Sequence, residues 1–314
     1  MKSIRLHYVA PWSWTQFHQH FALRLLPGVE TLDDGHYGRT LRMGNCVGWF
    51  RVCPRPEQGC LELTLSDSLQ DHASALTHRV RKMFDLDTDP AAVARHFSDD
   101  PLLAPLTAAN PGLRLPSAFD PFEQAVRAII GQQVTVKAAV TVTRRLVERL
   151  GEQVLPSPSD AVGNVLRLFP SPEVIASARL ENIGMPGKRV ATLQRFAAAV
   201  TDGALELHVN NGADELVSRL CELPGIGPWT AEYIALRGFG EADAFPAADL
   251  GLLKAPLWGS GGITAKALQA RAETWRPLRA YAAVHIWENY GSAITATTQQ
   301  ARAVESSPTP VVDP

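Results

Sequence analysis

The chain has 314 residues, a formal net charge of −2 at pH 7 and 46% hydrophobic residues, the composition of an ordinary globular protein of two or three domains. The charge excludes a protein that is basic throughout, although a local cationic surface or oriented backbone amides can still bind nucleic acid. Residues 1–7 lack the apolar run of a signal peptide and no stretch approaches the roughly 20 apolar residues that span a bilayer, so we expect a cytoplasmic protein.

The first 88 residues predict a small α+β domain. Residues 12–26 have a helical pattern, and residues 68–85 predict a second helix. Between them, three segments alternate like short antiparallel strands joined by turns: residues 36–43, 46–54 and 60–66.

The four cysteines show no metal-binding pattern. Cys46, Cys53 and Cys60 are seven residues apart, and Cys221 is remote. These spacings match neither the CxxC pairs of structural zinc nor the close cluster of an iron–sulfur site. We expect four reduced thiols, as is usual in the cytoplasm.

From residue 90 to about residue 291, helical patterns are separated by proline and glycine breaks. The most complete helix start is "DPFEQAVRAII", with Asp120 as N-cap, Pro121 at the first helical position and Glu123 in the first turn. The helix ends before "GQQVTVK", which predicts a bend. The polar pair in this bend is either a plain helix corner or a contact with a partner, and the sequence leaves both open.

The segment "LPGIGPWTAEYIALRGFG", residues 223–240, joins two predicted helices through a turn rich in glycine and proline. Gly225 and Gly227 permit positive φ and the close approach of another backbone, and Ile226 is expected to pack between the helices. Because Pro228 opens the second helix, the first amides of that helix point outward and form an anion site. Such a turn grips a nucleic-acid backbone without reading its sequence, but a plain tight corner would show the same residues.

Asp249 precedes the apolar segment 250–253 and, taken alone, predicts an N-cap. A carboxylate at this position is also held ionised by the helix dipole and by amide hydrogen bonds. Next to a turn that binds a phosphate, an ionised carboxylate is well placed to stabilise a cationic sugar.

Ordered motifs along the chain carry a resemblance to the helix-hairpin-helix superfamily of DNA glycosylases, and within it to the bacterial 3-methyladenine DNA glycosylase II family. They include "HYGRTL", "NPGLRLP", "DPFEQAVRAIIGQQV", "GMPGKR", "LPGIGPWTAEYIALRGFG" and "YAAVHIW". The resemblance implies a mostly α fold with an N-terminal α+β domain. The expected parts are residues 1–88, a helical domain from 89–112 and 231–293, a second helical domain from 113–230 that carries the hairpin, and a disordered tail over 294–314.

The resemblance also implies that Asp249 is the catalytic carboxylate, whose charge stabilises an oxocarbenium-like state while a base is excised. The preceding position, a second acid in a relative, is Ala248 here. Family members that also cut the strand use a lysine where this chain has Trp229, and indole forms no Schiff base. We therefore expect a monofunctional glycosylase without a lyase step.

Three aromatic residues, Trp229, Tyr233 and Trp287, match those that line the base pocket of the family. An electron-rich pocket attracts a cationic methylated base. His18 stands where a relative has an aromatic residue at the edge of this pocket. A simple core stripe remains the alternative for residues at this helical spacing.

Further roles follow from the same resemblance. Gln133 is expected to fill the gap that the flipped base leaves, and Lys188 and Arg189 either contact a second phosphate or are ordinary solvated charges. The backbone carbonyls of Leu223 and Gly225 are candidate ligands of Na⁺ or K⁺, and no organic cofactor is expected. The residues expected to contact DNA at the hairpin are Gly225, Ile226, Gly227 and Thr230.

The leading hypothesis is a monomeric enzyme that excises 3-methylpurine-type bases from double-stranded DNA and so starts base excision repair. We expect it to act at the bacterial nucleoid and to have no membrane partner. Two alternatives stay open: a binding module or damage sensor without catalysis, and a glycosylase for oxidised or mispaired bases. Asp249 argues against the first. The missing lysine and iron–sulfur cysteines argue against the endonuclease-like branches of the second.

Overall fold

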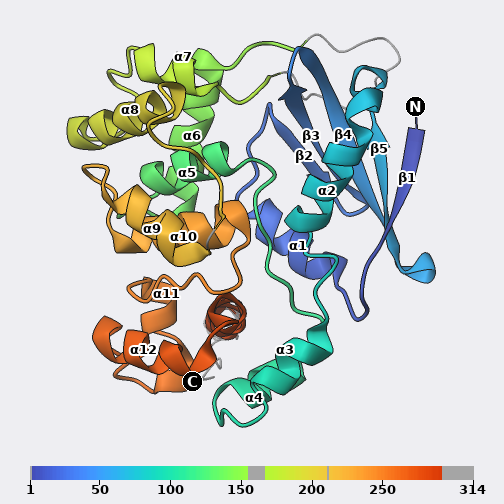
Figure 1. Ribbon diagram of the computed structural model, residues 1–314, viewed down its shortest axis with the longest axis vertical. Helices are drawn as coiled ribbons and strands as arrows, with labels where there is room; N and C mark the ends of the chain where they lie inside the picture. Colours follow the sequence, from blue (N-terminus) through green and yellow to red (C-terminus); the bar gives the residue numbers. More distant parts are fainter. Residues whose placement is uncertain (1, 155–166, 211, 292–314) are drawn as a thin grey trace, which may run out of the picture.

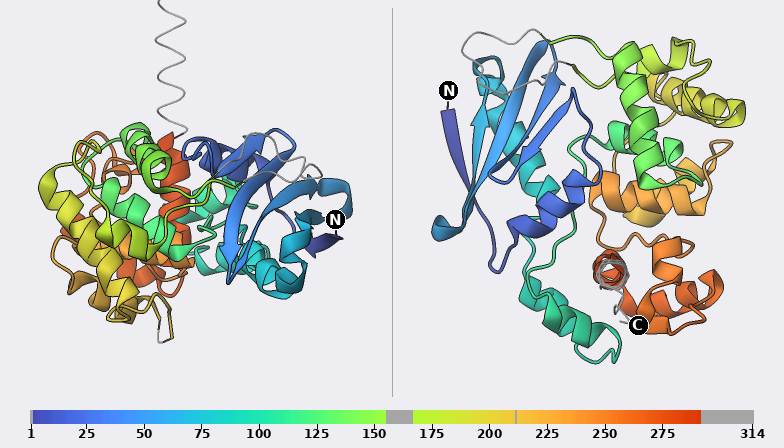
Figure 2. Two further views of the ribbon diagram at one scale, coloured as in Figure 1. Left: turned by 90° about the horizontal axis from the view of Figure 1, so that it is seen from above. Right: turned by 180° about the vertical axis from the view of Figure 1, so that it is seen from behind.

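The computed structural model describes residues 2–154, 167–210 and 212–291. A five-stranded antiparallel sheet stands at one side of the molecule and helices form the other side (Figures 1 and 2). The order in the sheet is β1-β5-β4-β3-β2. The strands are β1 (Lys2–His7), β2 (Glu30–Asp33), β3 (His36–Met43), β4 (Cys46–Arg55) and β5 (Cys60–Leu65).

The three central strands of the sheet lie where sequence alternation predicts them, whereas the two edge strands were not predicted. β2 has only four residues, too few to show a clear alternation, and β1 pairs with the sheet on one side only, through β5. The sheet packs against α1 (Trp14–Ala22) and α2 (Ala73–Met83), and their shared core is rich in aromatic rings. It includes Phe17, Phe21, Tyr37, Phe50 and Phe84.

Both helices of this region are shorter than predicted. The helix expected over residues 12–26 ends at Ala22, and the chain then turns toward Pro27, which disfavours helical conformation in the residue before it. The segment expected over residues 68–85 begins with a 3₁₀ turn, Asp67–His72, before α2.

The helical side of the molecule has one continuous core that runs from Val93 to Ile286. Its last helix spans residues 279–291. The predicted tail over residues 294–314 lies outside the described residues. The remaining helices are α3 (Pro90–His96), α4 (Leu103–Ala109), α5 (Pro121–Ile130), α6 (Val136–Leu150), α7 (Pro172–Ser177), α8 (Gly187–Thr201), α9 (Ala213–Cys221), α10 (Pro228–Phe239), α11 (Leu250–Leu253) and α12 (Ala265–Ala272).

Helix α5 holds the helical side together, since it packs on α6, α8 and α10. Its N-terminus forms as predicted, because the Asp120 side chain accepts the Glu123 N–H at 3.1 Å and Pro121 follows the cap. The Glu123 side chain does not complete a capping box. Its carboxylate binds Arg39 and Arg127 instead.

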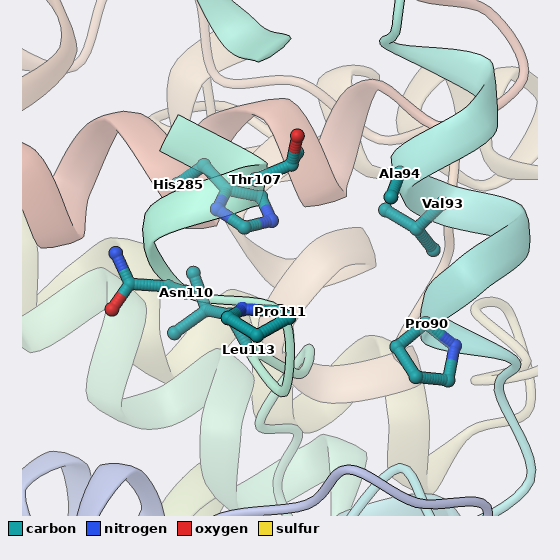
Figure 3. Close-up of a pocket in the computed structure, with 8 residues that line it drawn as sticks. All are labelled: Pro90, Val93, Ala94, Thr107, Asn110, Pro111, Leu113 and His285. Atoms are coloured by element: carbon teal, nitrogen blue, oxygen red, sulfur yellow. The ribbon is translucent and has the colours of Figure 1, made fainter. Parts of the chain in front are cut away.

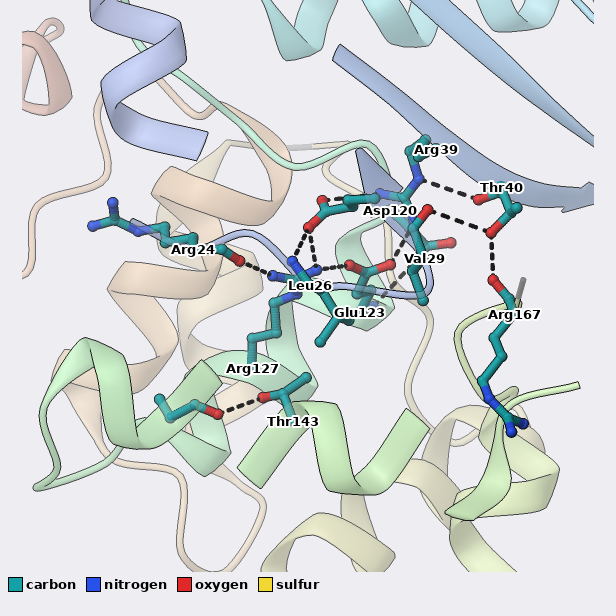
Figure 4. Close-up of polar contacts among 12 residues, drawn as sticks. Arg24, Leu26, Val29, Arg39, Thr40, Asp120, Glu123, Arg127, Thr143 and Arg167 are labelled. Carbon is teal, nitrogen blue, oxygen red and sulfur yellow. Dashed lines mark hydrogen bonds and ion pairs between the residues drawn. The ribbon is translucent and has the colours of Figure 1, made fainter. Parts of the chain in front are cut away.

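This carboxylate belongs to a buried ion cluster that joins the sheet to α5 (Figure 4). Arg39 of β3 lies 2.6 Å from Glu123, Arg127 lies 3.1 Å from Glu30, and the Tyr37 hydroxyl donates to Glu30 at 2.8 Å. Burial alone would raise the pKa of Glu123, but the two guanidinium groups outweigh burial and hold that pKa below its ordinary value. The two arginines and two glutamates balance each other and fix the sheet against the helices.

A small cavity of about 10 Å³ lies between α3, α4 and the last helix (Figure 3). Its volume is close to what one water molecule needs, and it borders His285, whose Nδ1 is buried without a partner. Burial lowers the pKa of His285 to about 4. With a volume of about 10 Å³, the cavity is too small for a base. In the part of the chain described, no helix is both long and apolar enough to cross a membrane.

Candidate active site and DNA-binding surface

Asp249 is the N-cap of α11, as its position in the sequence predicts. Its Oδ1 accepts the N–H groups of Gly251 at 2.9 Å and Leu252 at 3.3 Å. These two amide hydrogen bonds fix the position of the carboxylate at the helix start. The side chain stays partly exposed, and its neighbour Leu250 is 60% exposed, so a ligand can reach this part of the chain.

Two tryptophan side chains complete the hydrogen bonds to this carboxylate. The Trp287 Nε1–H donates to Oδ1 of Asp249 at 2.8 Å, and the Trp229 Nε1–H donates to Oδ2 at 3.1 Å. No ion pair to Asp249 occurs within residues 2–154, 167–210 and 212–291. The carboxylate is thus oriented by four neutral donors. Sequence reasoning assigned both indoles to the base pocket and missed their hydrogen bonds.

The three predicted pocket aromatics meet next to Asp249, although they come from two helices. Trp229 and Tyr233 of α10 stack with ring centroids 5.3 Å apart, and Tyr233 meets Trp287 of the last helix edge-on at 6.4 Å. All three rings are partly exposed. His18 lies 3.7 Å from Asp34, and in the described ranges it makes no ring contact with the three aromatics.

Arg237, which sequence reasoning missed, lies behind these rings. Its guanidinium stands over the Trp287 ring, 4.8 Å from the centroid, and donates to the Pro116 carbonyl at 2.9 Å. The side chain is buried, and burial lowers its pKa to about 10, so it is charged at neutral pH. The signal was present in the sequence, because residues 229, 233 and 237 recur every four positions on one helical face.

The turn between α9 and α10 has the geometry of a tight helical hairpin. Ile226 is buried between the helices as predicted. Gly225 has φ +98°, and a Cβ there would lie 2.0 Å from Thr192 Oγ1, so only glycine fits. Gly227 does not use the positive φ that glycine permits: its φ is −100°, and a Cβ there would meet no protein atom within 4 Å. The space at Gly227 is open to an external partner.

The start of α10 leaves backbone donors free at this turn. The first hydrogen bond of the helix runs from the Ala231 N–H to the Gly227 carbonyl at 3.0 Å, so the N–H groups of Trp229 and Thr230 have no helical acceptor. The Thr230 side chain is buried and accepts from Gln132 at 3.1 Å. Gln132, one of the polar pair in the predicted bend, also donates to the Gly225 carbonyl at 2.9 Å and ties the bend after α5 to the hairpin, a contact that the sequence did not predict.

The next residue of that bend, Gln133, is exposed and has φ +57°, which is uncommon for a residue other than glycine. Val134 and Val136, beside it, are 42% and 46% exposed. The bend therefore presents a polar side chain and two apolar ones to solvent next to the hairpin. Such a surface suits insertion into a base stack better than a solvated loop does.

Lys188 and Arg189 begin α8, one turn before Thr192, whose hydroxyl donates to the Pro224 carbonyl of the hairpin at 3.3 Å. Neither basic residue takes part in an ion pair in the described part of the chain. The start of α8, which carries the two basic residues, is thus joined to the hairpin through Thr192.

The carbonyls of Leu223 and Gly225 are partly used already. The Leu223 oxygen accepts the Ile226 N–H at 3.0 Å, and the Gly225 oxygen accepts from Gln132 at 2.9 Å. Each retains a second lone pair, so the residues fit a monovalent cation. No cluster of three or more His, Cys, Asp or Glu suited to a metal occurs among the residues that the structure describes.

Comparisons with known proteins agree with this architecture. Residues 3–120 match the AlkA N-terminal domain, and residues 126–279 match the HhH-GPD superfamily of base excision DNA repair proteins. DNA-3-methyladenine glycosylase 2 of Escherichia coli is 35% identical over 289 residues, which cover 91% of this chain and 97% of that protein. The resemblance drawn from the sequence motifs is confirmed.

A second relative is longer. The probable bifunctional transcriptional activator/DNA repair enzyme AlkA of Mycobacterium tuberculosis H37Rv is 38% identical over 285 residues, and the match spans 91% of this chain but only 56% of that protein. Among solved structures, a 3-methyladenine DNA-glycosylase from Archaeoglobus fulgidus superposes with a TM-score of 0.76 at 22% identity, over 91% of this chain and 97% of that one. The predicted fold, mostly α with an N-terminal α+β domain, is confirmed.

Proposed function

The chain belongs to the HhH-GPD superfamily of base excision DNA repair proteins and to its DNA-3-methyladenine glycosylase 2 family, and on this basis we propose that it excises alkylated bases from duplex DNA. The observation that carries the proposal is the Asp249 carboxylate, held by two amides and two indoles beside three partly exposed aromatic rings. A module that only binds the DNA backbone has no use for this arrangement.

The proposed reaction breaks the N-glycosidic bond. The electron pair of the C1′–N bond leaves with the base, and the sugar becomes an oxocarbenium ion. The Asp249 charge, fixed before the reaction by its hydrogen bonds, stabilises the positive charge that develops on the sugar. A water molecule then forms a bond to C1′ and releases a proton, which leaves an abasic site.

The proposed base pocket consists of Trp229, Tyr233 and Trp287. Stacking against these rings offsets part of the free energy that flipping the base out of the duplex costs. His18, which lies 3.7 Å from Asp34, is proposed at the edge of this pocket. Since Trp229 stands where strand-cutting members have a lysine, the proposal includes base release without a lyase step.

The proposed DNA anchor is the hairpin. The free N–H groups at the start of α10 bind a phosphate, a monovalent cation on the carbonyls of Leu223 and Gly225 adds positive charge there, and Gln133 enters the space of the flipped base. Lys188 and Arg189 contact a second phosphate. All of these groups come from one chain, so the enzyme is proposed to act as a monomer on DNA in the cytoplasm, at the nucleoid.

The catalytic half of the proposal is tested with Asp249→Asn on duplex DNA that contains 7-methylguanine. Wild-type protein is expected to release the free base and to give strand breaks only after alkali. The variant should release the base roughly a hundredfold more slowly or worse, the scale of losing one stabilising group. Unchanged affinity for DNA with an abasic-site analogue shows that the variant is folded. Equal release by both proteins would exclude Asp249 from the mechanism, and strand cleavage without alkali would refute the absence of a lyase step.

The anchoring half is tested with Gly227→Ala. A methyl group at Gly227 meets no protein atom and the backbone there is extended, so the melting temperature should stay unchanged. Affinity for abasic-analogue DNA should fall roughly tenfold or more if a phosphate approaches this turn closely, because one charge-assisted hydrogen bond contributes about 1.5–3 kcal/mol. Unchanged affinity would place the DNA elsewhere. Lys254→Ala, at an exposed position after α11, is the control.

A further inference from the structure

Two buried arginines in the described ranges have no carboxylate within 4.0 Å, Arg114 and Arg237, and Arg114 is bound instead by three backbone carbonyls, those of Val9, Pro11 and Thr88. Arg39 and Arg127 each bind a carboxylate directly, whereas Arg237 has no carboxylate within 4.0 Å in the described ranges. Only 6% of its surface is exposed, and its Nε is buried without a hydrogen-bond partner. A buried cation without a counter-ion is costly, so its position behind the pocket calls for a functional reason.

The groups around Arg237 leave its charge uncompensated. It hydrogen bonds to the Pro116 carbonyl and to the Tyr233 side chain, both neutral. Arg24, a second cation, and His20 lie on the side of α1, and burial together with the two guanidinium groups lowers the pKa of His20 so that its ring is neutral. The carboxylate that interacts with Arg237 is Asp249, which accepts the Nε1–H at the edge of the Trp287 ring, while Arg237 lies over the face of that ring.

We infer that Arg237 determines which charge state of a base the pocket selects, by placing a fixed positive charge behind Trp287 that weakens the binding of cationic bases and speeds the departure of every base. The inference rests on the proposed function, since it concerns the same pocket. It assigns a specificity-determining role to a residue that does not itself need to touch the base.

The charge balance of bond cleavage supports this role. When the C1′–N bond breaks, its electron pair stays on the base, so the charge of the base falls by one. A cationic base, such as 7-methylguanine, leaves neutral. A neutral base, such as hypoxanthine, leaves as an anion and then takes a proton from water. In both cases a nearby cation favours the product side, and at low dielectric this effect is strong.

The two kinds of base differ before the bond breaks. The guanidinium repels a bound cationic base and has little effect on a neutral one. Arg237 therefore raises the rate constant for both, but it weakens binding only for the cationic base. Arg237 should therefore raise the ratio of rate constant to half-saturating concentration for neutral bases. For cationic bases this ratio should stay nearly unchanged.

The experiment measures single-turnover release from two duplexes, one with 7-methylguanine and one with hypoxanthine, by wild type, Arg237→Met and Arg237→Lys. For Arg237→Met, the maximal rate constant should fall roughly tenfold on both duplexes, the scale of one charge at an effective dielectric near 20. The half-saturating enzyme concentration should fall only on the 7-methylguanine duplex. The ratio of maximal rate constant to half-saturating enzyme concentration should therefore drop roughly tenfold for hypoxanthine and stay within about threefold of wild type for 7-methylguanine. Arg237→Lys, which keeps the charge, should retain the wild-type preference.

Two results would overturn the inference: an equal fall, on both duplexes, of the ratio of maximal rate constant to half-saturating enzyme concentration in Arg237→Met, or the same change of preference in Arg237→Lys. Either would mean that Arg237 only packs against Trp287. The comparison between duplexes is internal to one protein sample, so a smaller folded fraction does not mimic the expected result. Arg237→Gln, which keeps a donor for Pro116, serves if the Met variant does not fold. Failure of the proposed function is a different result, in which wild type releases neither base.

Discussion

Two charged regions of the molecule are built in opposite ways. At the junction of the sheet and α5, Arg39 and Arg127 bind Glu30 and Glu123 directly. In the pocket, Arg237 and Asp249 carry opposite charges but form no direct ion pair: the Arg237 guanidinium lies over the face of the Trp287 ring, and Asp249 accepts the Nε1–H at the edge of that ring.

The difference separates a structural use of charge from a functional one. Ions that pair directly cancel each other's field, and what remains is a rigid joint between two parts of the chain. Ions that are kept apart and held by neutral hydrogen bonds retain a field that acts on whatever enters between or beside them. We therefore expect changes in the junction to affect stability, and changes in the pocket to affect base release.

Glu123→Gln should have the largest effect of the tests that follow, and the effect should be on stability. The change leaves two buried guanidinium groups with one carboxylate between them, and breaking a buried pair in this way costs about 3–5 kcal/mol of the free energy of unfolding. Denaturant unfolding at neutral pH measures it.

The control for this prediction is Glu152→Gln. It breaks the contact of Glu152 with Arg42 on the surface, where the two side chains are 61% and 43% exposed, and an exposed pair contributes at most about 1 kcal/mol. Equal losses in the two variants would mean that the junction cluster is not held by its charges.

Trp287→Phe should have the next largest effect, on base release. The phenyl ring keeps an aromatic face for a base and for Arg237 but removes the N–H that donates to Asp249 at 2.8 Å. A hydrogen bond to a charged group contributes about 1.5–3 kcal/mol, so single-turnover release should slow by roughly 10- to 100-fold. Trp14→Phe loses a similar donor, which binds the Asp34 carbonyl at 3.0 Å, and should release base at the wild-type rate. A wild-type rate in Trp287→Phe would show that Asp249 does not depend on this donor.

Local signals in the sequence predicted the parts of the fold that local chemistry decides. Asp120 and Asp249 cap their helices as predicted, and the residues of the hairpin turn indicate its tight geometry. The edge strands β1 and β2 were missed because their existence depends on pairing with strands distant in the chain. The sequence permits a positive φ at both Gly225 and Gly227, and only Gly225 adopts one, at the reversal next to Thr192.

The site was predicted as a set of residues but not as a network. The aromatic spacing on α10 and the motif resemblance brought Trp229, Tyr233 and Trp287 together, and the structure places them side by side. The contacts of Gln132 with the hairpin and of Arg237 with Trp287 join segments that are far apart in the sequence. Sequence periodicity does not predict such contacts, because they depend on how the helices pack against one another.

The smallest expected effect is a pH dependence that distinguishes the two buried charges. The folded-state pKa of Glu123 is held below its ordinary value of 4.5, so its pairing adds stability above that pH, and the addition is lost as the pH falls through the folded-state pKa. The stability difference between wild type and Glu123→Gln should therefore narrow below pH 4.5, by at most about 1.4 kcal/mol per pH unit. Arg237 titrates at about 10 and stays charged throughout this range, so the difference between wild type and Arg237→Met should not change there. Denaturant unfolding curves of wild type and variant, recorded at neutral and at acidic pH, measure both differences. Because each difference compares two proteins at the same pH, the titration of the other carboxyls cancels. If the difference in free energy of unfolding between wild type and Glu123→Gln does not change with pH, the two arginines do not lower the pKa of the Glu123 carboxyl.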